Sequence, residues 1–142
     1  MKEIKKWVAI IPARSGSKRL PNKNLLKLGN ESLVEIAVQK ALETNIFDKV
    51  IISSDSEEII DLAKSKGALS YGLRDHNLST DSAKTIDVIK QLLNNEELSE
   101  VVGFTLLQCT SPFTTIKTIK NVTFQAFKSK YSSISIRELE HT

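Results

Sequence analysis

The sequence contains little that would allow covalent or metal cross-links. Only one of its 142 residues is a cysteine. An internal disulfide is therefore excluded, a reducing compartment is compatible, and no cysteine-based metal site is predicted. We expect Cys109 to be a buried or half-buried thiol. His76 and His141 stand apart from any metal-ligand spacing and are interpreted as loop residues without a functional role.

Long apolar segments and targeting signals are also lacking. The longest apolar run, residues 7–11, is far shorter than the roughly 20 residues that cross a bilayer. The charged residues 1–6 lead into it without a small-residue cleavage site, so we expect a cytoplasmic protein with no membrane partner. The formal charge of +3 is weak, and no aromatic platform accompanies the basic residues. A nucleic-acid partner is therefore not expected.

The composition that is present is typical of a globular protein, with 40% apolar and 26% charged residues. A chain of this length buries roughly 68–70% of the surface that its unfolded form exposes, which is enough for a core without cross-links. Collagen-like, coiled-coil and small disulfide-rich folds are excluded. We expect one domain over residues 1–142.

Short apolar, β-branched segments alternate with amphipathic segments along the chain. Buried strands are predicted at residues 7–13, 49–53, 68–72 and 101–107, with a last β-rich run at 131–136. Helices are predicted at about residues 32–44, 57–66, 81–93 and 115–130. This alternation indicates a parallel sheet with helices on both faces. The ligand crevice of such a sheet lies outside the carboxyl ends of its strands, so we expect the site in the loops after residues 13, 53, 72 and 107.

Several polar residues have a spacing typical of helix caps. Ser32 with Glu35 three positions later matches a capping box, and it precedes apolar residues that share one helical face, namely Leu33, Ile36, Ala37 and Ala41. Asp81 is interpreted as a helix cap. For Asp55, a helix cap and a role in the site are equally supported.

The loop after the first strand has a composition suited to a polyanion. From Arg14 to Asn24 it contains no acidic residue and four basic ones, Arg14, Lys18, Arg19 and Lys23. Gly16 and the small Ser15 and Ser17 would let backbone N–H groups approach phosphate oxygens closely. The glycine patterns of P-loop NTPases and of dinucleotide oxidoreductases are absent, so neither class is predicted. The alternative is a basic loop that is simply solvated.

The segment IIPARSGSKRLPNKN at residues 10–24 resembles the N-terminal signature of the acylneuraminate cytidylyltransferases, which activate sialic and related nonulosonic acids. Three further segments agree in order and spacing: VIISSD at 50–55, LRDHNLSTDSAKT at 73–85 and LLQCTSP at 106–112. The resemblance implies a Rossmann-like, three-layer α/β/α nucleotidyltransferase fold with a mainly parallel sheet. It also implies that the domain continues beyond Thr142, where the family's metal-binding aspartates and dimerising segment would lie.

The function implied by the resemblance is transfer of CMP from CTP to a nonulosonic acid such as N-acetylneuraminate, giving CMP-sugar and pyrophosphate, with Mg²⁺ as cofactor. For the full-length proteins of the family it implies a homodimer. By resemblance, Arg14 and Lys23 are the catalytic residues that hold the triphosphate. The other nucleotide-binding residues are Ala13, Ser17, Lys18, Asn24, Arg74 and Thr85, and the acceptor sugar would meet Gln108, Thr110 and Ser111.

Two departures from the family pattern leave the acceptor open. Arg19 stands where the sialic acid branch usually has glycine, and a cation there is similar to the branch that acts on pseudaminic acid. Cys109 replaces a proline, although the rest of its motif is of the sialic and legionaminic type. A non-catalytic CTP-binding fragment or module remains the alternative function, and Arg74 in a surface ion pair with Asp75 remains an alternative for that residue.

Overall fold

Four parallel strands form the centre of the molecule. The computed structural model describes residues 4–16, 23–73 and 85–129. In it, the main sheet consists of β1 (Ile4–Pro12), β4 (Phe47–Ser53), β5 (Leu69–Ser70) and β6 (Gly103–Leu106). The strand order is β5-β4-β1-β6, and all neighbouring strands are parallel. The predicted β-rich run at 131–136 lies outside the described residues.

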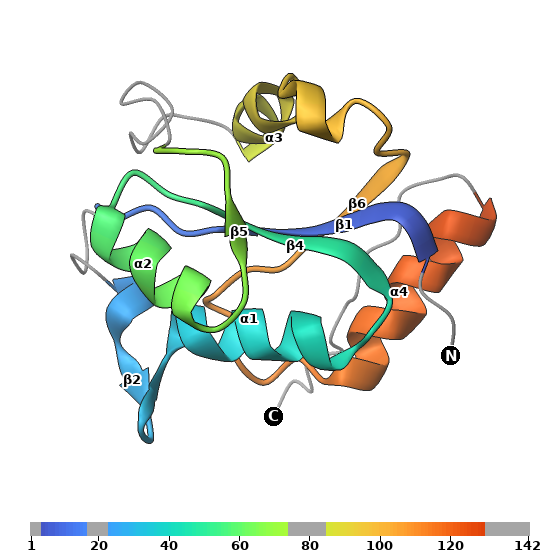
Figure 1. Cartoon of the computed structure of the whole chain (residues 1–142). Coiled ribbons are helices and arrows are strands. Elements are labelled where there is room, and N and C mark those ends of the chain that lie inside the picture. The colour runs from blue at the N-terminus through green and yellow to red at the C-terminus, as the bar shows by residue number, and fades with distance from the viewer. Residues whose placement is uncertain (1–3, 17–22, 74–84, 130–142) are drawn as a thin grey trace, which may run out of the picture.

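Helices cover both faces of this sheet (Figure 1). One face carries α1 (Leu33–Glu43), α2 (Glu57–Ser65) and α4 (Ile116–Ser129), and the other carries α3 (Thr85–Leu93) with the short 3-10 helix η3 (Glu96–Leu98). The predicted three-layer α/β/α architecture is therefore confirmed. Among the described residues, no helix combines the length and the apolar character needed to cross a bilayer.

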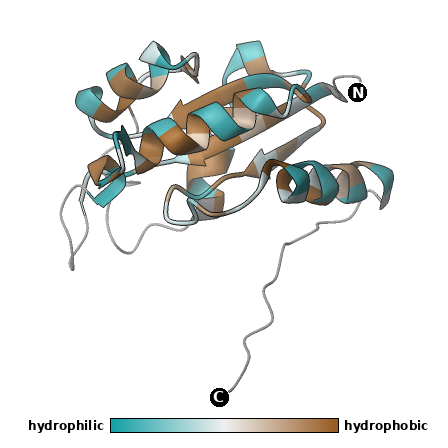
Figure 2. Ribbon diagram, turned by 90° about the horizontal axis from the view of Figure 1, so that it is seen from below, coloured by the Kyte–Doolittle hydropathy of each residue, from teal (hydrophilic) through white to brown (hydrophobic). Residues whose placement is uncertain are grey.

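Strand β1 lies at the centre of the core. Its residues Val8, Ala9, Ile10 and Ile11 are all 0% exposed. Because successive strand side chains point to opposite faces, Ala9 and Ile11 pack with α1 and α2, whereas Val8 and Ile10 pack on the side of α3. A strand covered on both faces needs such a continuous apolar run. Figure 2 shows the hydrophobic colour along the strands and on helix surfaces.

Helix α1 begins with the predicted capping box. The Ser32 hydroxyl accepts the Glu35 N–H at 3.2 Å, and the Glu35 carboxylate accepts the Ser32 N–H at 3.1 Å. The pKa of Glu35 lies below its usual value, chiefly because of this backbone hydrogen bond, with a further contribution from Lys66 at 3.4 Å. The predicted apolar face was partly wrong: Leu33 and Ile36 are only half-buried. The buried face consists of Val34, Ala37, Val38 and Ala41.

A small hairpin was not predicted. It pairs β2 (Lys27–Leu28) with β3 (Glu31–Ser32) in an antiparallel manner and follows the 3-10 helix η1 (Lys23–Leu25). Gly29 opens the two-residue turn with φ = 71°, which glycine adopts at little cost. The hairpin joins the end of the basic loop to the start of α1.

Candidate functional site

The carboxyl ends of three strands lie side by side. Pro12 of β1 is in register with Ser53 of β4, and the pairing continues where the Ala13 N–H donates to the Ser53 carbonyl at 2.9 Å. On the other side of β1, the Leu107 N–H donates to the Ile10 carbonyl at 2.9 Å. The chain adds β4 and β5 on one side of β1 and β6 on the other. The switch point at which parallel sheets bind ligands therefore lies between β1 and β6.

The basic loop follows β1 at this switch point, and a hydrogen bond from Asn24 joins its two ends. Ala13 is 1% exposed, Arg14 is half-buried, and Lys23 is half-buried in η1. The Asn24 side chain, 5% exposed, donates from Nδ2 to the Arg14 carbonyl at 2.9 Å. This contact brings the two ends of the loop, at Arg14 and at Asn24 with its neighbour Lys23, close together. Ser17 and Lys18 lie outside the described residues.

A second contact holds the loop from the neighbouring strand. The Asp55 carboxylate accepts the Ser15 N–H at 2.8 Å and the Ser15 hydroxyl at 2.9 Å. The interpretation of Asp55 as a helix cap is wrong, because Ser56 caps α2 by accepting the Ile59 N–H at 3.3 Å. The sequence suggested that the Ser15 N–H and hydroxyl would donate to phosphate. In the structure both donate to Asp55 instead. Sequence reasoning missed this pair, because nothing in the pattern identifies a partner 40 positions away.

The cytidine side is described only in part. Arg74 and the interpreted cap Asp81 lie outside the described residues, and Thr85 opens α3 but its side chain is not described. The structure has a hollow of about 170 Å³ between the ends of β4 and β5 and helix α3. Its lining includes Ser53, Tyr71, Gly72, Gln91 and Asn95.

The segment predicted to meet the acceptor follows β6. Gln108, Thr110 and Ser111 are all exposed, and the Ser111 N–H donates to the Gln108 carbonyl at 3.1 Å in a tight turn. Lys40 of α1 holds the far side of this turn, where its Nζ donates to the carbonyls of Pro112 and, at 2.7 Å, of Thr114. No sequence pattern indicated this role for Lys40. Its two bonds fix the segment between the crevice and α4.

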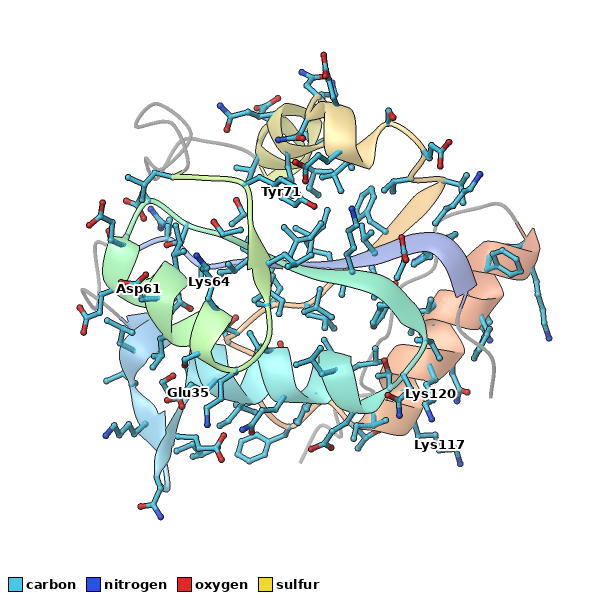
Figure 3. The ribbon with its side chains drawn as sticks, viewed as in Figure 1. Glu35, Asp61, Lys64, Tyr71, Lys117 and Lys120 are labelled. Atoms are coloured by element: carbon cyan, nitrogen blue, oxygen red, sulfur yellow. The ribbon has the colours of Figure 1, made fainter. Side chains whose placement is uncertain are left out.

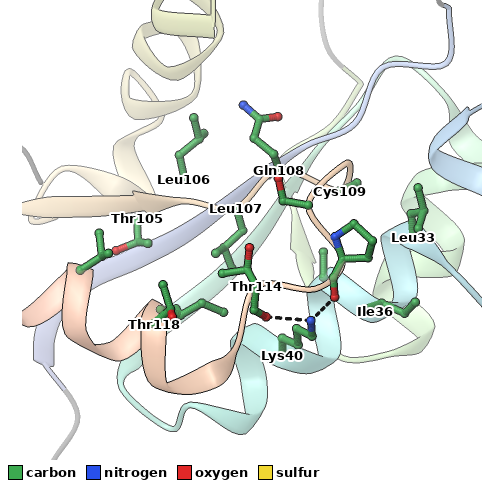
Figure 4. A pocket seen from close by; sticks show the side chains of 15 residues that line it. Leu33, Ile36, Lys40, Thr105, Leu106, Leu107, Gln108, Cys109, Thr114 and Thr118 are labelled. Carbon is green, nitrogen blue, oxygen red and sulfur yellow. Dashed lines mark hydrogen bonds between the residues drawn. The ribbon is translucent and has the colours of Figure 1, made fainter. Parts of the chain in front are cut away.

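A cavity of about 150 Å³, lined by both polar and apolar residues, lies beneath the turn, between α1 and α4 (Figure 4). The half-buried Leu33 and Ile36 belong to its lining. The Gln108 amide points away from Lys40 in this view. Cys109 also lines the cavity and is 2% exposed, which confirms the predicted buried thiol, and burial raises its pKa to about 12. Such a thiol is a poor nucleophile.

Other charged side chains lie on the outer helices. Asp61 and Lys64 belong to α2, and Lys117 and Lys120 to α4 (Figure 3). Across residues 4–16, 23–73 and 85–129, no group of three or more histidine, cysteine, aspartate or glutamate side chains is arranged to hold a metal ion.

The family follows from the comparison with known proteins. The model of a family described as cytidylyltransferase matches residues 8–141. The chain belongs to the cytidylyltransferase family. The matched range contains the basic loop, Asp55 and the turn after β6.

Related cytidylyltransferases are named for different acceptors. The chain is 44% identical over 108 residues to an N-acylneuraminate cytidylyltransferase of Escherichia coli O18:K1:H7, covering 76% of this chain and 25% of that protein. It is 43% identical over 88 residues to a pseudaminic acid cytidylyltransferase of Campylobacter jejuni, covering 62% and 38%. It is 37% identical over 116 residues to a CMP-N,N'-diacetyllegionaminic acid synthase of Legionella pneumophila, covering 80% and 50%.

A solved structure supports the fold independently. CMP:2-keto-3-deoxy-manno-octonic acid synthetase, solved in complex with CTP, superposes with a TM-score of 0.73 at 20% identity, covering 89% of this chain and 49% of that one. The nucleotidyltransferase fold predicted from the sequence is therefore confirmed. The chain spans between a quarter and a half of the length of the three relatives named above.

Proposed function

We propose that residues 1–142 form the nucleotide-binding part of an enzyme that transfers CMP from CTP to a nonulosonic acid and releases pyrophosphate. The observation that carries this proposal is the arrangement at the switch point. A loop without acidic residues, with Arg14 and Lys23 at its mouth, faces one side of the β1–β6 junction, and the Gln108 turn faces the other. A polyanionic nucleotide and an acceptor would thus meet between them.

The reaction requires the anomeric hydroxyl of the sugar to attack the α-phosphorus of CTP. Such a phosphoryl transfer needs positioning and charge neutralisation more than covalent participation by the protein. In this proposal, Arg14 and Lys23 neutralise the triphosphate, while Gln108, Thr110 and Ser111 orient the acceptor. Ser17, Lys18 and Asn24 are assigned to the nucleotide by resemblance.

The cytidine would occupy the hollow beside α3, and Ala13 is assigned to the nucleotide by resemblance. Support comes from position, because Leu73 lines this hollow and immediately precedes Arg74, which the resemblance assigns to the nucleotide together with Thr85. A pocket that hydrogen-bonds one base leaves polar groups unpaired when another base enters, at about 1–3 kcal/mol per group.

By resemblance to the family, we also propose a cytoplasmic enzyme that uses Mg²⁺ and assembles as a homodimer. Magnesium would neutralise phosphate charge when bound. We assign it no ligand among the described residues and no step. The relatives named above are named for different acceptors, and we propose the shared class, a nonulosonic acid, rather than one member.

Two measurements test this function. Competition binding should give CTP at least a tenfold preference over ATP, GTP and UTP, and comparable affinities for CTP and ATP would contradict the proposal. Pyrophosphate release from CTP, measured with a panel of sialic, pseudaminic and legionaminic acids, should depend on one of these acids. CTP binding without release for any of them would favour the alternative, a non-catalytic CTP-binding module.

A further inference from the structure

Asp55 is a carboxylate placed beside a loop that we propose binds phosphates. It lies two residues after β4 and is half-buried. Both of its oxygens accept hydrogen bonds from Ser15, one from the backbone and one from the hydroxyl. Because Ser56 caps α2, the helix does not need this carboxylate. The structure therefore leaves Asp55 without a capping role and gives it instead a contact with the loop that follows the neighbouring strand.

The electrostatics of this position argue that the contact has a function. A carboxylate near a triphosphate repels it, and that repulsion is reduced when N–H and O–H donors offset the negative charge. Ser15 supplies both donors. It stands between Arg14, which the proposed function assigns to the triphosphate, and Gly16, where an added Cβ would meet nothing within 4 Å. Holding Ser15 in place therefore also restrains the backbone of Arg14 and Gly16, its two neighbours in the loop.

The loop is consequently held on two sides before any ligand arrives. Asn24 binds the Arg14 carbonyl from within the loop, and Asp55 binds Ser15 from the end of β4. A loop that is already ordered loses less conformational entropy when a ligand binds. The affinity for the anion should therefore depend on Asp55 even though its own charge is unfavourable.

We propose that Asp55 is a positioning residue that holds the Arg14–Gly16 segment in the conformation that receives the CTP phosphates, through its two hydrogen bonds to Ser15. This inference rests on the proposed function, because it assumes that the loop binds CTP. It also assigns the donors of Ser15 to hydrogen bonds within the protein, so that the rest of the loop would donate the hydrogen bonds to phosphate.

The test compares CTP and cytidine binding by calorimetry, each with Mg²⁺ and with EDTA. Asp55→Ala should weaken CTP binding about tenfold and cytidine binding less than twofold, because only the phosphate part meets the loop. Asp55→Asn should recover CTP binding to within about threefold of the unmodified chain. Its amide oxygen can still accept the Ser15 N–H, and its amide group can donate to the Ser15 hydroxyl. Asp61→Ala is the matched control, since Asp61 is exposed on α2 and loses the same charge.

The outcomes separate this inference from the proposed function. If the unmodified chain does not bind CTP, the proposed function fails. If it binds CTP and Asp55→Ala binds equally well, the positioning role is wrong. If Asp55→Asn is as weak as Asp55→Ala and the effect of Mg²⁺ is lost in both, Asp55 is a metal ligand, which also overturns the proposal. Should Asp55→Ala fail to fold, Ser15→Ala removes only the hydroxyl bond, and it should weaken CTP binding two- to fivefold while cytidine binding stays constant. An unchanged CTP affinity in that variant would refute the positioning role.

Discussion

A single added carbon at Gly103 should destabilise the sheet more than most surface substitutions. Gly103 of β6 is in register with Trp7 of β1, and a Cβ built on it would lie 2.2 Å from Cζ3 of the indole. The ring cannot move freely, because Nε1 donates to the Thr105 hydroxyl at 3.0 Å, which is bonded at 2.7 Å to the Thr123 hydroxyl of α4. Phe127 adds an edge-on contact at 6.0 Å. Overpacking costs about 1–3 kcal/mol and a lost hydrogen bond about 1 kcal/mol, so Gly103→Ala should lower the free energy of unfolding by about 2–4 kcal/mol.

Urea denaturation measures this loss, with unfolding followed by circular dichroism and by the fluorescence of Trp7, the only tryptophan. Gly16→Ala is the control, because a Cβ there meets nothing within 4 Å, and it should change the free energy of unfolding by less than about 1 kcal/mol. Trp7→Val in combination with Gly103→Ala should cost less than the sum of the two single changes, since the clash is then absent. An unchanged midpoint in Gly103→Ala, or full additivity in the double variant, would refute this account of the packing.

Three further predictions follow from the described side chains. Arg14→Ala and Lys23→Ala should each weaken CTP binding by about 1.5–3 kcal/mol and cytidine binding much less; equal losses for CTP, CDP and cytidine would contradict the assignment to the triphosphate. Cys109, with its pKa near 12, should react with iodoacetamide at pH 8 at least about a hundredfold more slowly in the native chain than in denaturant, and equal rates would show that the thiol is accessible. Because the pKa of Glu35 is lowered in the folded chain, the stability it contributes is present above its unfolded pKa and is lost as pH falls through the folded value. Glu35→Gln should therefore lower the free energy of unfolding at neutral pH, and this loss should disappear in acid. A loss that stays constant between the variant and the unmodified chain from pH 7 to pH 3 would count against this linkage.

Much of the fold could be predicted because local patterns and tertiary structure agree. The apolar run in β1 indicated a strand buried on both faces, and Ser32 with Glu35 marked the start of α1. The hairpin at residues 27–32 was not predicted, because two-residue strands are too short to show a period. The buried face of α1 was partly misassigned, since Leu33 and Ile36 border a cavity whose other wall is α4. Periodicity predicts that a helix has an apolar face, but it does not predict which elements cover that face.

The site was predictable in outline and not in detail. The carboxyl ends of parallel strands form one edge, so the loops after β1 and β6 had to approach each other. The contacts that hold these loops depend on register, which the sequence does not display. Asp55 reaches Ser15 because β4 pairs with β1 at Ser53 and Pro12. The sequence supported a helix cap and a role in the site equally for Asp55, and it did not indicate the contact with Ser15.

The two predicted binding segments are held by different elements. A substitution in one segment therefore need not disturb the other. Asp55, at the end of β4, holds the basic loop, whereas Lys40, on α1, holds the carbonyls that follow the Gln108 turn. Neither anchor contacts the other's segment in these hydrogen bonds. With separate anchors, side chains of the turn can change without altering the hydrogen bonds that hold the basic loop. Cys109 lies in that turn and is buried in the core cluster with residues of α1 and β1. The departure at Cys109 is therefore accommodated by the protein core, whereas Gln108, Thr110 and Ser111 are exposed and, under the proposed function, would be the positions that meet the acceptor.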